Sequence, residues 1–152
     1  MHEAEKMADV NSALRSLIEV LHDGHRGMME IGKHLQNEPA KLLFLRESQV
    51  RAEYAAELEN ELHRLGQPDV REGGTSAGTV HRIWGTLKAH LGGGDHTLLE
   101  TAEEREDEAM SAYDKILQEK LPGNVHELLA RQQDHIAQIH DKVKRLRDSN
   151  AA

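Results

Sequence analysis

From Val10 to Leu35 the apolar residues recur at intervals of three and four, and Gly24 fills one slot of that series. Such spacing places side chains on one face of an α-helix. The stretch QNEPA interrupts the series, because a proline disfavours helical backbone at the residue before it and suits the first turn of a helix. The pattern therefore predicts a helix over residues 8–36 and a second helix, over residues 39–65, that folds back antiparallel on the first.

The same spacing returns in the second half of the chain. It predicts long helices over residues 96–120 and 123–147, separated by the turn-forming stretch LPGN. Asp95 is placed to cap the first of these two helices. A long connection with glycine-rich ends precedes it, and the amphipathic stretch TVHRIWGTLKAHL inside that connection predicts a short helix over residues 77–91.

Two short connections thus flank one long crossover. A bundle with up-down-up-down topology needs only short loops, whereas a long crossover lets the second and third long helices run in the same direction. The chain is therefore predicted to be all-α, a ferritin-like four-helix bundle that forms a single domain over residues 1–152. Trp84, in the crossover, is interpreted as a packing residue that seals the bundle.

Composition and charge support a helical fold and narrow the classes of function. The chain has one Phe, one Trp and two Tyr, which disfavours a sheet. A net charge of -8, with basic residues spread thinly except near the C-terminal end, argues against nucleic acid as a partner. Apolar runs are far shorter than the roughly 20 residues that span a bilayer, and the first residues do not form a signal peptide. We expect no membrane association and a cytoplasmic location. The absence of cysteine excludes disulfides and thiolate metal sites.

Each long helix has a break in its apolar face near its midpoint. The breaks are Gly24 in the first helix, Ser48 and Arg51 in the second, Glu106 in the third and Gln132 in the fourth. Helix midpoints lie at a common height in an antiparallel bundle, which is where ferritin-like proteins hold their metal. The sequence therefore predicts one buried polar layer in the core.

The stretch RQQDH, residues 131–135, differs from the ExxH pair of a di-iron site by having Gln132 in place of the glutamate. The second helix offers Arg51 where a ligand would sit, and a guanidinium repels a metal ion and attracts Glu106. We interpret the layer as a buried ion pair between Arg51 and Glu106, supported by Gln132, which replaces a di-iron site. This interpretation expects no cofactor and a protein that is not an enzyme.

The alternative is a metal-binding protein that holds Fe, Mn or Zn. Its ligands would be three glutamates, on two helices, and a histidine, because hard cations prefer carboxylate oxygens and imidazole completes the shell. The candidates are Glu57, Glu103, Glu106, His135 and His140. A third reading is a small-molecule pocket bordered by the polar layer.

Five stretches of the chain carry a family resemblance. They are AAELENELHRLG (55–66), SAGTVHRIWGTLK (76–88), Glu103, Glu106 and Asp107 followed by Ala112 and Tyr113, LPGNVHELLARQ (121–132) and HDKVKRLRD (140–148). Together they resemble the bacterial ferritin-like four-helix-bundle proteins of unknown function, over nearly the whole chain. The resemblance implies a ferritin-like fold without established catalytic residues. Arg51 and Gln132 fit the family pattern, and His135 departs from it.

The expected function is that of a non-catalytic helical bundle with a stress-related or scaffolding role. The apolar faces account for the core of a monomer, and self-association into a homo-oligomer is left open. No feature of the sequence identifies a protein or small-molecule partner.

Overall fold

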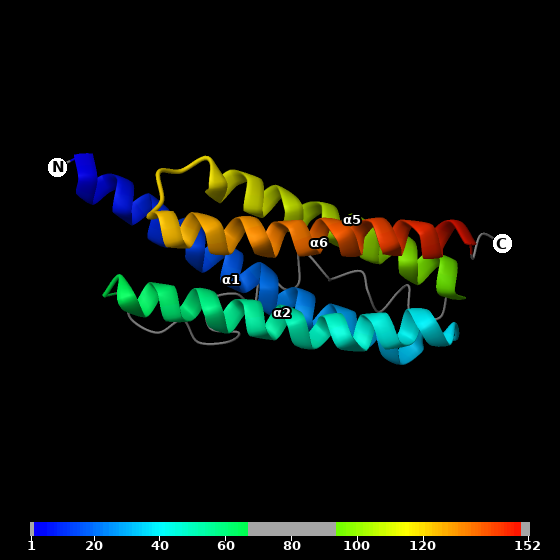
Figure 1. The fold of residues 1–152 in the computed structure, drawn as a ribbon. Coiled ribbons are helices and arrows are strands. Elements are labelled where there is room, and N and C mark those ends of the chain that lie inside the picture. Colours follow the sequence, from blue (N-terminus) through cyan, green and yellow to red (C-terminus); the bar gives the residue numbers. More distant parts are fainter. Residues whose placement is uncertain (1, 67–93, 150–152) are drawn as a thin grey trace.

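The computed structural model describes residues 2–66 and 94–149 and contains four long helices. They are α1 (His2–His34), α2 (Glu38–Arg64), α5 (Gly94–Leu117) and α6 (Gly123–Ser149), and they pack as one elongated bundle (Figure 1). The predicted all-α four-helix bundle is confirmed. The predicted short helix over residues 77–91, with Trp84, lies outside the described residues.

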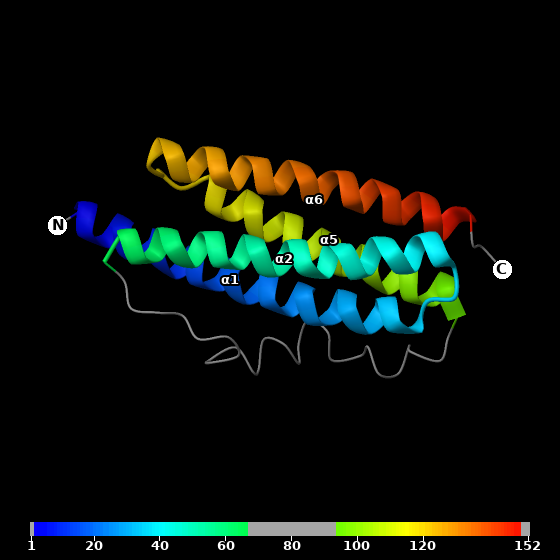
Figure 2. The ribbon, with the colours of Figure 1, turned by 60° about the horizontal axis from the view of Figure 1, so that its bottom comes forward.

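Helix α1 packs against α2 and α5, and α6 packs against α5 and, more loosely, against α2. Each of these neighbours is antiparallel (Figure 2). Backbone N–H groups of Gln36 and Asn37, just before α2, donate to the carboxylate of Asp95 at 2.9 and 2.8 Å. Helices α2 and α5 therefore begin at the same end of the bundle. These two helices consequently run in the same direction.

The turn between α1 and α2 follows from the capping chemistry of Asn37. Its side chain accepts a hydrogen bond from the Ala40 backbone N–H at 3.0 Å, which satisfies one of the free donors at the start of α2. Helix α2 therefore begins at Glu38, one residue before the predicted start, with Pro39 in its first turn.

Asp95 has a different role from the predicted one. Helix α5 already begins at Gly94, whose φ of +83° suits glycine, so Asp95 lies inside the first turn instead of capping the helix. Its carboxylate accepts from the turn between α1 and α2, as described above, and links three helices at one end of the bundle.

The hydrophobic core consists of two clusters on either side of the midpoint of the bundle. One joins Val10–Leu21 of α1 to the C-terminal half of α2, and the other joins Met28–Leu35 to the N-terminal half of α2. The predicted apolar positions are buried almost without exception, which confirms the helix phases. Between the two clusters lie the polar residues that interrupt the apolar face of each helix.

Candidate functional site

The centre of the bundle holds an ion pair between α2 and α5. Arg51 donates from Nη1 to Glu106 Oε1 at 2.7 Å and from Nη2 to Glu106 Oε2 at 2.6 Å. Both residues are 1% exposed. This two-pronged geometry matches the planar fork of a guanidinium to a carboxylate and is the strongest form of side-chain ion pair.

Gly24 of α1 leaves the space that the Arg51 side chain occupies. A β-carbon at position 24 would lie 3.6 Å from Arg51 Nη1 and 3.8 Å from its Cγ, which is ordinary van der Waals contact. A longer side chain there would meet the guanidinium. The break in the apolar face of α1 therefore accommodates the large cation of α2 and supplies no ligand.

Electrostatics hold Arg51 in its charged form despite burial. Burial alone would lower the pKa of this guanidinium, but the charge of Glu106, its hydrogen bonds and the charge of Glu47 together raise the pKa above its ordinary value. Arg51 Nε lies 3.6 Å from Glu47 Oε2. One buried cation thus faces two buried carboxylates.

Glu47 is a buried member of the layer that the sequence analysis missed. It is 2% exposed, and its Oε1 lies 2.7 Å from His135 Nε2 of α6. The His135 ring also meets Tyr54 edge to face, with ring centroids 5.8 Å apart. A signal was present, since Glu47 lies three residues after Phe44 and four before Arg51, on the edge of the buried face of α2.

Gln132 is buried, but the hydrogen bonds of its side chain go to other partners than the predicted ones. Its Oε1 accepts from the Tyr113 hydroxyl at 2.7 Å, and its Nε2 donates to Glu57 Oε1 at 3.4 Å and to the Tyr54 carbonyl at 3.5 Å. Burial raises the pKa of the Tyr113 phenol well above its usual range, so the hydroxyl remains a donor. Gln132 thus joins a separate contact beside the ion pair.

Ser48 and His25 fasten α1 to α2 at the edge of the layer. The Ser48 hydroxyl donates to the His25 carbonyl at 2.8 Å, and His25 Nδ1 lies 2.7 Å from the Ser48 carbonyl oxygen. The carbonyl can only accept, so Nδ1 carries the proton. The polar residue Ser48 therefore binds α2 to its neighbour α1.

The candidate metal ligands lie in separate contacts. Glu106 pairs with Arg51, Glu57 meets Gln132, and His135 meets Glu47. Within residues 9–66 and 94–149, no group of three or more His, Asp or Glu side chains is placed to hold a metal ion.

His140 and Glu103 lie in a contact of their own between α5 and α6. His140 Nε2 is 2.8 Å from Asp107 Oδ1 and 4.0 Å from Glu103 Oε1, and Arg147 donates to Glu103 Oε2. The Arg147 cation competes with any metal ion for Glu103.

Asp23 of α1 is a third buried acid, beside Glu47 and Glu106, and the apolar spacing of α1 did not indicate it. It is 1% exposed, and neither carboxylate oxygen has a hydrogen-bond partner in the part of the chain that the structure describes. Burial raises its pKa from the ordinary value of 3.8 to about 7, with Glu19 adding to the rise and Arg26 and His22 opposing it. Asp23 therefore makes the folded state sensitive to pH.

The geometry of the layer defines which chemistry it supports. A carboxylate whose two oxygens both accept from one guanidinium cannot act as a general base without breaking that pair.

No described helix is both long and apolar enough to span a bilayer.

Comparison with known proteins gives a family for the chain. A search of curated proteins finds no match. Residues 9–119 match the family defined as a domain of unknown function, DUF2383. This match covers α1 from Asp9 onward and the whole of α2 and α5, and it stops before α6. The chain, with its four-helix bundle, therefore belongs to the DUF2383 family.

Proposed function

We propose that this protein is a non-catalytic, metal-free bundle of the ferritin-like type that acts as a binding or scaffolding protein. The observation that carries the proposal is the two-pronged pair of Arg51 and Glu106 at the midpoint of the bundle. Ferritin-like di-iron proteins place carboxylate and histidine ligands at this height. Here an obligate cation occupies the interior and engages both oxygens of the carboxylate.

The directions of the helices support the ferritin-like part of the proposal. Helices α2 and α5 run in the same direction, so Gly66 after the end of α2 and Gly94 at the start of α5 lie at opposite ends of the bundle (Figure 2). One long crossover with two short connections is the arrangement of ferritin-like bundles.

The energetics of burial support a structural role for the pair. Removing one partner of a buried ion pair leaves an uncompensated charge and destabilises by about 3–5 kcal/mol, whereas the intact pair contributes little net stability. The pair therefore penalises arrangements of the helices that separate Arg51 from Glu106. It fixes how α2 and α5 are aligned along the bundle axis.

Metal analysis tests the proposal. Protein without a tag, purified without chelator and then incubated with Fe(II), Mn(II) or Zn(II) and desalted, is expected to retain far less than one metal ion per chain. The same result is expected for Glu106→Gln and for the matched control Glu104→Gln, whose parent residue is exposed.

A stoichiometric metal that Glu106→Gln removes and Glu104→Gln retains would overturn the proposal in favour of a metal site in the layer. Loss of such a metal in Glu103→Gln and His140→Gln would instead place it beside Asp107. Either outcome would establish the alternative, metal-binding function.

A further inference from the structure

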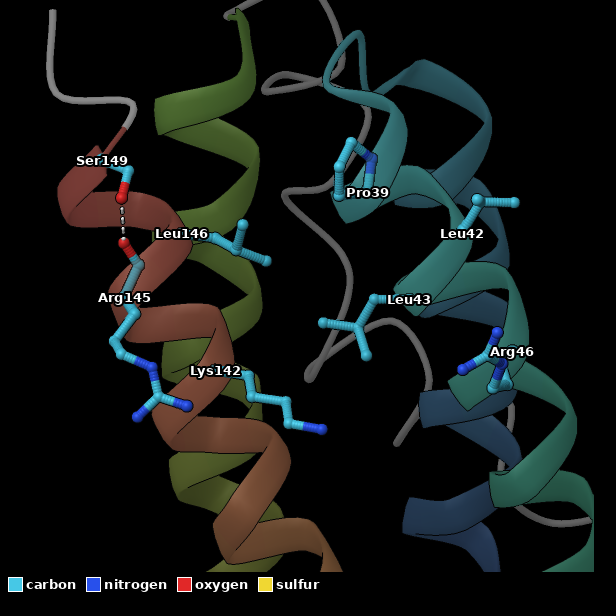
Figure 3. A pocket seen from close by; sticks show the side chains of 8 residues that line it. All are labelled: Pro39, Leu42, Leu43, Arg46, Lys142, Arg145, Leu146 and Ser149. Atoms are coloured by element: carbon cyan, nitrogen blue, oxygen red, sulfur yellow. Dashed lines mark hydrogen bonds between the residues drawn. The ribbon is translucent and has the colours of Figure 1, made fainter.

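A groove opens between the first turns of α2 and the last turns of α6 (Figure 3). Its volume is about 490 Å³. Leu43 of α2 and Leu146 of α6 point toward each other across it, and the Lys142 side chain reaches into it from α6. None of the residues that line the groove is a member of the Arg51 layer.

The floor of the groove is apolar and continuous with the core. Leu43 and Leu146 are partly buried and pack against the core cluster that contains Phe44 and Val143. Leu42, at the edge, is 59% exposed and is the one large hydrophobic residue exposed among those that the structure describes. The three leucines together give the groove an apolar wall.

The rim of the groove is basic. Arg46, Lys142 and Arg145 line it, all three are exposed, and no acidic residue is among the lining residues. None of the three forms a side-chain ion pair within the described ranges, although the chain as a whole carries a net charge of -8. A local cluster of one sign beside an apolar wall concentrates ligands of the opposite charge.

We propose that this groove binds a single-chain amphiphilic anion, of the class of fatty carboxylates. Arg46 and Lys142 extend toward the groove from opposite sides and match the carboxylate, which would accept charge-assisted hydrogen bonds from both (Figure 3). The apolar floor between Leu43 and Leu146 matches the hydrocarbon chain. The volume of the groove falls in the range of about 300–1,000 Å³ that holds small ligands.

A second copy of this chain fits the groove poorly. A symmetric contact through Leu42 would bring the two sets of Arg46, Lys142 and Arg145 together, and like charges repel. A head-to-tail contact would need a second apolar patch, and Leu42 is the only exposed large hydrophobic residue in the described part of the chain.

Titration with laurate, a C12 carboxylate used below its micellar concentration, tests the proposal on the full chain. Calorimetry is expected to give one saturable site. The laurate-induced changes in a ¹H–¹⁵N correlation spectrum should concentrate on residues 39–46 and 142–149. Dodecyltrimethylammonium, with the same chain length and the opposite charge, should leave these signals unchanged.

Charge variants distinguish laurate binding in the groove from non-specific attraction between laurate and basic side chains elsewhere on the surface. Arg46→Gln with Lys142→Gln should weaken laurate binding at least about fivefold. The matched control, Lys120→Gln with Lys144→Gln, removes the same charge from exposed positions outside the groove and should bind as the wild type does. Circular dichroism would verify that each variant is folded.

The proposal is overturned if laurate shows no saturable site, or if its spectral changes fall outside the groove. Equal laurate affinity in the charge variant and its control would also overturn it, as would binding of the cationic amphiphile at the same residues. Concentration-dependent self-association that Leu43→Gln abolishes would assign the groove to a second copy of the chain instead.

Discussion

Gly24 of α1 lies against the side chain of Arg51 of α2, and a methyl group at position 24 would make ordinary van der Waals contact with that side chain. In the sequence, this glycine is a gap in an apolar series. In the structure, it is the space that lets a guanidinium reach Glu106 at 2.7 and 2.6 Å inside the bundle. A missing side chain on one helix thus accommodates a large charged one on its neighbour.

Two glycines of α1 should respond in opposite ways to alanine. Gly24→Ala is expected to leave stability unchanged or raise it by up to about 1 kcal/mol, because alanine favours a helix interior. Gly32→Ala places a β-carbon 2.9 Å from Leu45 Cδ2 and 3.3 Å from Phe44 Cβ, so the Leu45 side chain must shift and the contact between α1 and α2 must loosen. We expect a loss of about 1–3 kcal/mol.

Urea unfolding followed by circular dichroism measures both variants under the same conditions. Each replacement is the same change within the same helix, so each variant is the control for the other. If Gly32→Ala proved as stable as Gly24→Ala, the close contact between α1 and α2 would be wrong.

Removing one member of the central pair should be more damaging than removing both. Arg51→Met and Glu106→Leu are each expected to lower the free energy of unfolding by about 3–5 kcal/mol, since the first leaves Glu106 without its cation and the second leaves Arg51 with only the longer, 3.6 Å contact to Glu47. The double variant should lose less than either single variant. Additive losses in this double-mutant cycle would show that the two side chains are not coupled.

Asp23 should make stability fall as the pH rises. Its pKa is raised from 3.8 to about 7 in the folded state, so between these values the folded protein binds more protons than the unfolded chain. The destabilising contribution is absent below about pH 4, grows through this window and is complete above about pH 7. Asp23→Asn should therefore gain stability relative to the wild type, on the order of 2–4 kcal/mol at pH 8 and little at pH 4.

Chemical denaturation of the wild type and Asp23→Asn at several pH values between 4 and 8 measures this difference. Asp134→Asn, at an exposed position of α6, is the matched control and should track the wild type throughout. A constant difference between Asp23→Asn and the wild type across the range would rule out ionisation of Asp23 as its cause.

Asp95 should hold one end of the bundle together. Asp95→Ala removes the carboxylate that accepts from the Gln36 and Asn37 backbone N–H groups. We expect a loss of about 1–3 kcal/mol and an intermediate loss for Asp95→Asn, which keeps one acceptor oxygen. Amide hydrogen exchange gives a local readout, because exchange at these two N–H groups should become faster. Unchanged exchange would argue that the turn is held by other contacts.

The periodicity of the sequence determined the four described helices, their buried faces and the burial of Arg51, Glu106 and Gln132. Periodicity is a property of each helix alone, so a run such as Val10 to Leu35 defines its own inward face without knowledge of the partner. The same pattern predicted that a cation and a carboxylate would share the core. It also indicated which short connections join antiparallel helices.

Apart from the pair of Arg51 and Glu106, only the tertiary structure decided which polar groups meet. Gln132 binds Tyr113, Glu47 binds His135, and Asp95 binds the turn before α2. These contacts depend on the height and rotation of one helix relative to another, which packing of whole faces decides and no single helix encodes. The groove between Leu43 and Leu146 has the same origin, because its walls come from two helices, α2 and α6, that only the fold brings side by side.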